Sequence, residues 1–319
     1  MSPIIEKTVP SSTLQAGRKD WCLGLRILLG FILLYAAIWV IRVVMGVGPN
    51  LLLKWIGASP NVRAYLGGTL NYGVGIASYI VLPAIALRKT LNIKPRAVFF
   101  PLHKGWWQDL VFGLLLVTII LTSFFVIEVK LGWLVVKDWN WQALTLAALL
   151  RTAWVGLLVN IGVAIGEETI FRGYLLTGLK TGLGKWPALS VMMVIFGLFH
   201  LPAYSASGGM HSWTLTLAIL LATLFGGLFG LIYLRTKSLW LPISLHFAWN
   251  FIENDVLNLT AVSNNPNLVG AQTRLQSPLT AAGFSLGNVV VLEVAMFALI
   301  ALGVWLFLKY TPENFGLST

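Results

Sequence analysis

Long apolar stretches dominate this chain and restrict what it can fold into. Each is near or above the roughly 20 residues that a helix needs to cross a bilayer, although some are short. Their ends are uncertain by several residues. We therefore expect an all-α, polytopic membrane protein with about eight transmembrane helices, at approximately 22–46, 65–87, 107–129, 145–168, 187–203, 213–234, 239–257 and 284–308.

The composition agrees with this fold class. Of 319 residues, 57% are hydrophobic and only 10% are charged, and the mean hydropathy is +0.82. These values exclude soluble enzymes. The net charge is +11, but the basic residues are spread between apolar stretches, so no nucleic-acid partner is expected. The single cysteine, Cys22, excludes an intrachain disulfide and a cysteine-based zinc cluster.

Lysine and arginine predict the orientation. If the N-terminus is cytoplasmic, fifteen of the 22 basic residues fall on the cytoplasmic side and seven on the other. We expect an integral, multi-pass protein of the cell membrane with both termini in the cytoplasm. The predicted divisions are a polar cytoplasmic segment (1–21), N-terminal transmembrane helices (22–145), a catalytic core (146–257), a polar outer loop (258–283), and a last helix with a short tail (284–319).

Two adjacent glutamates and an arginine lie beside the fourth apolar stretch. Glu168 and Arg172 are four residues apart, about 40° around a helix, so they can pair. Glu167 points about 100° away, shares a face with Asn160 and has no local counter-charge. These charges could mark a helix end at the water interface. At membrane depth, however, an ionisable residue is costly and indicates a functional site.

Two of the four histidines lie in other apolar stretches. A lone histidine there is more often structural, but His200 and His246 together with an unpaired glutamate favour catalysis. In a low-dielectric site Glu167 would be a good base for a water molecule that His200 could share. His246 and Asn250, one helical turn apart, could both donate hydrogen bonds to a developing oxyanion.

The same residues also permit a metal site. Glu167, His200 and His246, with Asn250 in a weaker role, could ligate zinc and leave one position for water. No H-E-x-x-H helix supports this alternative. Serine and cysteine mechanisms lack support, since no serine lies in a G-x-S-x-G setting.

Three motifs, in order on separate apolar stretches, resemble the signatures of the CPBP family. This family, also called ABI, comprises CAAX prenyl endopeptidases and bacteriocin-processing or immunity proteins. The resemblance covers roughly 150–255, including the Phe171-Arg172-Gly173-Tyr174-Leu175 and Leu234-Arg235-Thr236-Lys237-Ser238-Leu239-Trp240 surroundings. The motifs are Glu167-Glu168-x-x-x-Arg172, Phe196-x-x-x-His200 and His246-x-x-x-Asn250.

The resemblance implies an intramembrane endopeptidase that acts on a membrane-associated or lipidated protein or peptide. Glu167 would activate water together with His200, and His246 and Asn250 would stabilise the oxyanion. Family members are described both as metalloproteases and as metal-free enzymes with glutamate-activated water, so zinc stays open.

In the same scheme Glu168 and Arg172 would hold the site in shape. A fourth helix that ended at 168 would leave the motif at the membrane edge, whereas His200 would lie about 20 Å deep. We therefore expect this helix to begin later and to continue through Arg172 toward Lys180, with 145–156 a separate segment. We also expect a cavity open to the cytoplasm and, laterally, to lipid.

Two other functions use the same residues. A transporter would move protons or ions along Glu167, Glu168, Arg172 and Glu293, although no inverted repeat is visible. Glu293 alone is more simply a structural glutamate bonded to a neighbouring helix. A non-catalytic immunity protein of the same family would keep the fold and tolerate loss of Glu167.

Overall fold

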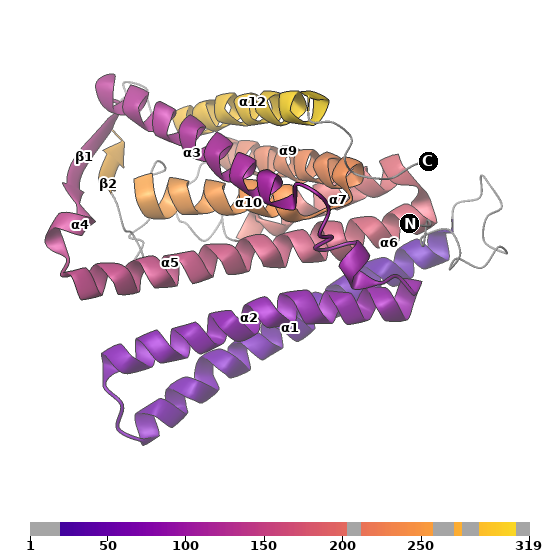
Figure 1. The fold of residues 1–319 in the computed structure, drawn as a ribbon, viewed down its shortest axis with the longest axis horizontal. Coiled ribbons are helices and arrows are strands. Elements are labelled where there is room, and N and C mark those ends of the chain that lie inside the picture. Colours follow the sequence, from indigo (N-terminus) through magenta and orange to yellow (C-terminus); the bar gives the residue numbers. More distant parts are fainter. Residues whose placement is uncertain (1–19, 203–211, 258–270, 276–286, 311–319) are drawn as a thin grey trace.

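The computed structural model describes residues 20–202, 212–257, 271–275 and 287–310. Almost all of them are helical (Figure 1). The α-helices are α1 (Trp21–Trp55), α2 (Pro60–Leu91), α3 (Trp106–Lys130), α4 (Asn140–Ala143), α5 (Leu146–Glu167), α6 (Thr177–Leu183), α7 (Lys185–Phe199), α9 (Ser212–Thr236), α10 (Trp240–Asn250) and α12 (Gly287–Tyr310). A 3₁₀ turn, η1 (Pro95–Ala97), and two π-helical segments, η2 (Glu168–Leu176) and η3 (Phe251–Leu257), complete the helical elements.

The predicted all-helical membrane fold is confirmed. Each of the eight apolar stretches forms a helix in the part of the chain that the structure describes. Five helical stretches are long and apolar enough to cross a membrane, namely α1, α2, α3, Leu146–Leu183 and Leu215–Thr236. Shorter apolar helices are Lys185–Phe199 and Val294–Tyr310, while α10 continues into η3.

A small antiparallel sheet was not predicted. Strand β1 (Leu134–Trp139) pairs with β2 (Ala271–Leu275), and the register shifts between Val136 and Asp138. β2 lies within the predicted 258–283 loop, whose other residues lie outside the described part of the chain. The same is true of 1–19 and of 311–319.

The fourth membrane helix differs from its prediction in one respect. Its continuation past Arg172 is confirmed, since α5, η2 and α6 form one helical stretch that ends at Leu183. The expected separate segment at 145–156 is wrong, because α5 begins at Leu146. The side chain of Thr145 caps its first turn, which starts the helix there.

The helices share two ends, which we name by what they hold. At the strand end lie β1 and β2. The other end holds the starts of α1, α3, α7 and α10 together with Lys180, Lys185 and Lys237, and we call it the basic end. Contacts join these elements there: Asp20 N donates to Gly182 O (2.9 Å), and the Trp106 and Trp240 rings lie 5.0 Å apart.

α12 also finishes at the basic end, where Arg235 donates to Leu308 O. The described chain thus enters and leaves the bundle at one end (Figure 1). That this end faces the cytoplasm stays a prediction.

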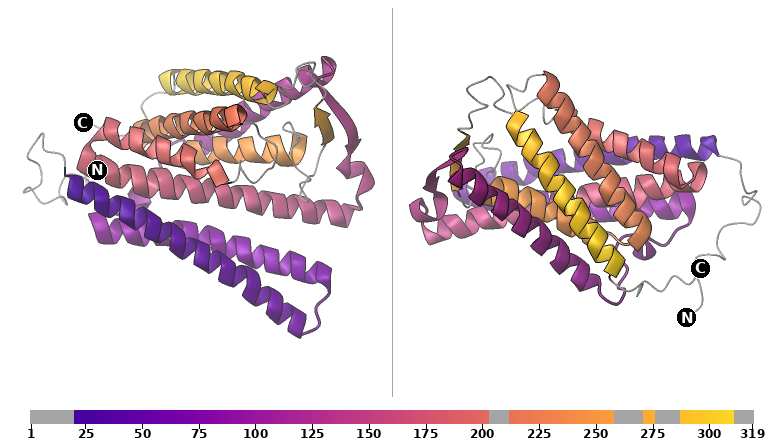
Figure 2. Two further views of the ribbon diagram at one scale, coloured as in Figure 1. Left: turned by 180° about the vertical axis from the view of Figure 1, so that it is seen from behind. Right: turned by 90° about the horizontal axis from the view of Figure 1, so that it is seen from above.

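Two apolar cores flank the central helical stretch formed by α5 and η2. The first joins α1, α2, η2, α6 and α7 and includes the fully buried Phe171 and Tyr174. The second joins α3, α9, α10 and α12 around side chains such as Leu121 and Leu245. The α1–α2 hairpin lies on one side of α5, and α10 with α3 lies on the other (Figure 2). The predicted catalytic segments therefore meet at the centre of the bundle.

Candidate active site

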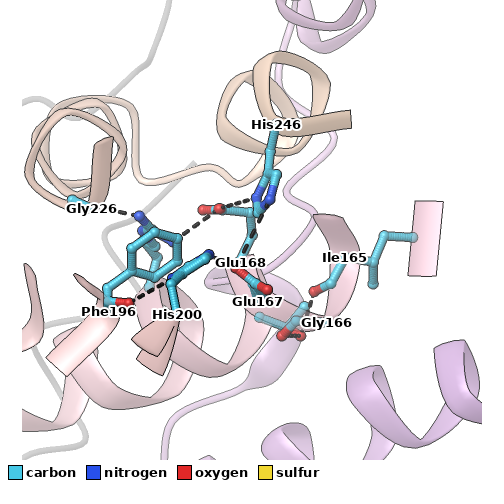
Figure 3. Close-up of polar contacts among 10 residues, drawn as sticks. Ile165, Gly166, Glu167, Glu168, Phe196, His200, Gly226 and His246 are labelled. Atoms are coloured by element: carbon cyan, nitrogen blue, oxygen red, sulfur yellow. Dashed lines mark hydrogen bonds and ion pairs between the residues drawn. The ribbon is translucent and has the colours of Figure 1, made fainter. Parts of the chain in front are cut away.

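Glu167 lies at the end of α5, where it faces two histidines (Figure 3). Its Oε2 atom is 3.8 Å from Nε2 of His200 and 3.9 Å from Nε2 of His246. The three side chains are 17%, 22% and 9% exposed, respectively. Residues from three separate helices thus converge on one point, as the sequence predicted.

Glu167 and His200 lie at similar depths in the bundle, because the helices that carry them are longer than predicted. Glu167 lies 16 residues before Leu183, where α6 ends, and His200 lies 15 residues after Lys185, where α7 begins. Both ends are at the basic end of the bundle. At the α-helical rise of 1.5 Å per residue His200 lies about 22 Å from it, and Glu167 is a similar number of residues away.

The hydrogen bonds of the two imidazoles define their tautomers. Nδ1 of His200 lies 2.8 Å from the carbonyl oxygen of Phe196, and Nδ1 of His246 lies 3.0 Å from Oε1 of Glu168. A carbonyl and a carboxylate only accept, so each Nδ1 carries the proton. When such a ring is neutral, the lone pair of Nε2 points toward Glu167.

Three acceptor atoms therefore surround one point. The distances of 3.8 and 3.9 Å exceed a hydrogen bond, and Oε2 of Glu167 is buried without a hydrogen-bond partner in the described part of the chain. A contact of this length between polar atoms is a natural place for a bridging water. The geometry suits a molecule that donates hydrogen bonds.

Glu168 and Arg172 form the predicted pair. Nη1 of Arg172 lies 2.9 Å from Oε1 of Glu168, and both side chains are fully buried. Arg172 also donates to the carbonyl oxygen of Gly226 and lies over the ring of Phe196, 4.3 Å from its centroid. These contacts bond Oε1 of Glu168 and both Nη atoms of Arg172, while Oε2 of Glu168 and Nε of Arg172 are buried without a hydrogen-bond partner among the described residues.

The backbone around Glu167 is specialised. The π-helical segment η2 begins at the next residue, and π-helical turns are frequent at functional sites. Oγ1 of Thr169 lies 2.7 Å from the carbonyl oxygens of Ile165 and Tyr79, so it ties η2 to α2. A Cβ atom at Gly166 would lie 2.8 Å from the ring of Tyr79. Only glycine permits this close approach beside Glu167.

No hydrogen bond joins the Asn250 side chain to the other site residues within the described part of the chain. It is the last residue of α10, one turn after His246, and it is half-buried. Its carbonyl accepts from Asn254. Within the described residues its side-chain amide forms no hydrogen bond, so its predicted role toward an oxyanion stays a prediction.

The atoms around Glu167 are spaced more widely than the ligands of a zinc ion. Ligand atoms about 2.0–2.2 Å from a tetrahedral zinc would lie roughly 3.4 Å from one another, shorter than the separations around Glu167. Among described residues, no group of three or more His, Cys, Asp or Glu side chains could hold a metal ion. Glu167, His200 and His246 therefore do not fit zinc in this geometry, and we derive no step through it.

Sequence reasoning missed a second polar contact on α5. Nδ2 of Asn160 donates to Oδ2 of Asp255 over 2.7 Å, and both side chains are buried. This bond joins α5 to η3, the segment that follows Asn250. Asp255 and the buried Glu253 end an apolar stretch, so the cost of burying a charge, which singled out Glu167, could have identified them as well.

A comparison with protein families covers the same part of the chain. Residues 149–252 match the family model described as type II CAAX prenyl endopeptidase Rce1-like. This third of the chain is similar to the Rce1-like family. This match confirms the resemblance to the CPBP family, and it includes all four predicted catalytic residues. No curated protein and no solved structure gives a significant match.

The matched segment is similar to CAAX-type endopeptidases, and the apolar helices indicate an integral membrane protein. This segment spans α5 through α10 and extends two residues into η3. Helices α1, α2, α3 and α12 lie outside the match. Of these, α1 and α2 pack against the helical stretch formed by α5, η2 and α6.

Proposed function

We propose that the protein hydrolyses a peptide bond of a membrane-anchored or lipidated substrate, with water activated by Glu167. The observation that carries this proposal is the convergence of Oε2 of Glu167 with Nε2 of His200 and of His246. A water molecule at this point would donate one hydrogen bond to the carboxylate and one to an imidazole.

In the proposed reaction, Glu167 takes a proton from water as the oxygen attacks the peptide carbonyl. His200 orients the water through Nε2. The carboxylate then returns the proton to the leaving nitrogen, so the peptide bond breaks without a covalent enzyme intermediate.

His246 would stabilise the negative charge that develops on the carbonyl oxygen of the peptide bond. Its Nδ1–H is already bonded to Glu168, so Nε2 can donate to an oxyanion only when the ring is protonated. The hydrogen bond to Glu168 would hold the ring in the orientation that this needs. Asn250, one turn further, would supply a second donor after a small side-chain movement.

The experiment is cleavage of a quenched, membrane-anchored peptide library by the purified protein in lipid nanodiscs. We expect Glu167→Gln to lower kcat about 10²- to 10⁴-fold, as loss of a general base does, with unchanged thermal unfolding. Glu128→Gln is the matched control. Glu128 is also a buried membrane glutamate but lies in α3 with the second core, so cleavage should persist.

Cleavage by Glu167→Gln at the wild-type rate would contradict this mechanism. If no variant cleaved any peptide, the transporter and immunity alternatives would gain. The transport path would also need Glu293, whose side chain lies outside those that the structure describes.

A further inference from the structure

Arg42 is a cation inside the helical bundle, and its surroundings differ from those of Arg172. It lies on α1, 13 residues before the helix ends, and it is half-buried. Its Nη1 atom donates to the hydroxyl of Tyr79 over 3.4 Å, and its guanidinium lies 5.5 Å from the centroid of Tyr72.

No anion neutralises this guanidinium within the described part of the chain. None of the described carboxylates lies within 4 Å of it, whereas Arg172 has Glu168 at 2.9 Å. A guanidinium has five N–H donors, and the one side-chain bond to Tyr79 is long. The site therefore has positive charge and donors to spare.

A cavity of about 100 Å³ opens beside Arg42. The guanidinium and two phenol rings line one part of it, and small or apolar residues line the rest. The lining residues are Arg42, Tyr72, Gly75, Ile76, Tyr79, Val159, Gly162 and Val163. This volume suits a small planar anion such as a carboxylate, which arginine binds through two parallel hydrogen bonds.

Tyr79 connects the cavity to the proposed active site. Its ring packs on Gly166, the neighbour of Glu167, while its hydroxyl accepts from Arg42. The α5 residues that line the cavity, Val163 and Val159, precede Glu167 by one and two helical turns, about 6 and 12 Å along the helix. The cavity therefore lies beyond Glu167 toward the strand end.

An extended peptide advances about 3.3–3.6 Å per residue. A bound chain that passes Glu167 would thus reach the cavity within two to four residues. We propose that Arg42 and Tyr79 form a subsite that binds a carboxylate of the peptide substrate, two to four residues from the bond that is cut. This inference rests on the proposed function, because the peptide is placed by Glu167.

The carboxylate could be the C-terminal group or an acidic side chain. The test therefore uses lipid-anchored fluorescent peptides of one sequence that end in a free acid or an amide, and amidated peptides with Glu or Gln near the end. Binding is measured by fluorescence anisotropy to the Glu167→Gln protein in uncharged nanodiscs, so turnover does not interfere.

We expect the acid-bearing peptide to bind roughly 10- to 100-fold more tightly than its neutral twin, as for a hydrogen bond to a charged group. Adding Arg42→Gln should abolish this preference and leave binding of the neutral peptide unchanged. Adding Arg26→Gln is the matched control, since Arg26 is exposed on the same helix, and should preserve it. A preference for the free acid over the amide identifies the C-terminal group, and a preference for Glu over Gln identifies an acidic side chain.

Equal binding of acid and neutral peptides would overturn the subsite, as would equal weakening of both by Arg42→Gln. Loss of the preference in phosphatidylglycerol nanodiscs would assign Arg42 to a lipid phosphate instead. The two proposals fail differently. If the preference for the acid depends on Arg42 but the protein with Glu167 intact cleaves nothing, the proposed function fails and only carboxylate binding by Arg42 stands.

Discussion

Nδ1 of His246 donates to Glu168, 78 residues earlier in the chain, over 3.0 Å. The bond joins α10 to η2 and orients the imidazole so that Nε2 faces Glu167. Glu168 also pairs with Arg172 through the same oxygen. One buried carboxylate thus positions both a neighbouring helix and a proposed catalytic ring.

Glu168→Gln should destabilise the protein strongly. The change keeps the side-chain volume but leaves the buried Arg172 without a counter-charge. We expect about 3–5 kcal/mol less free energy of unfolding, measured by denaturant titration in detergent. The double variant Glu168→Gln/Arg172→Met removes both charges and should recover part of the loss. A double variant no more stable than the single one would show that the ion pair is not the cause.

Chelators should leave cleavage unchanged. Among the described residues Glu167, His200 and His246 do not form a metal-holding group, and the proposed reaction uses only a carboxylate and imidazoles. Activity is measured before and after incubation with EDTA and with 1,10-phenanthroline, alongside the zinc content of the purified protein. Inhibition that added zinc reverses would instead support the zinc alternative.

Gly166→Ala should disturb both the proposed active site and the Arg42 cavity. The new Cβ would lie 2.8 Å from the ring of Tyr79, which would have to move. Overpacking of this kind costs about 1–3 kcal/mol, and thermal unfolding would show it. Gly73→Ala in α2 is the control, because its new methyl group would meet no atom within 4 Å. Equal unfolding temperatures for both variants would contradict the packing argument.

Lys237 should react with acylating reagents at unusually low pH. It lies in the turn between α9 and α10, where burial and the charges of Lys180 and Lys185 lower its pKa to about 8. Its labelling rate, followed by mass spectrometry, should level off above about pH 8, because the amine is then neutral. A rate that still rises tenfold per unit near about pH 10 would contradict the lowered pKa.

The lowered pKa of Lys237 also makes the free energy of unfolding depend on pH. Between about pH 8 and 10.5 the unfolded chain holds a proton that the folded chain has lost. Stability should therefore rise with pH across this window. Lys237→Met should remove this contribution, and the change should be small because the side chain is only half-buried.

Hydropathy predicted the helices well because a bilayer-sized apolar run has few alternatives. The pairing of Glu168 with Arg172 was predictable for a similar reason, since it is local to one helix. Contacts between distant segments were not. The bond from His246 to Glu168, the approach of Tyr79 to Gly166 and the cavity beside Arg42 depend on how helices pack, which periodicity does not encode.

The β1–β2 pair illustrates another limit of the sequence. Leu134–Trp139 and Ala271–Leu275 are short and far apart in the chain. Each becomes a strand only because the other is held beside it by the bundle. The error at 145–156 was different, since it came from an assumed helix length and could have been avoided by recognising the Thr145 cap.

The π-helical segment that follows Glu167 also determines how far α6 is rotated about the helix axis relative to α5. A π-turn contains more residues than an α-turn, so η2 rotates α6 relative to α5 by an amount that a regular helix would not give. Deleting one residue within Glu168–Leu176 would change this rotation by about 100°. Every side chain on one side of the deletion would then face a new neighbour. This segment should therefore tolerate substitutions far better than changes in length.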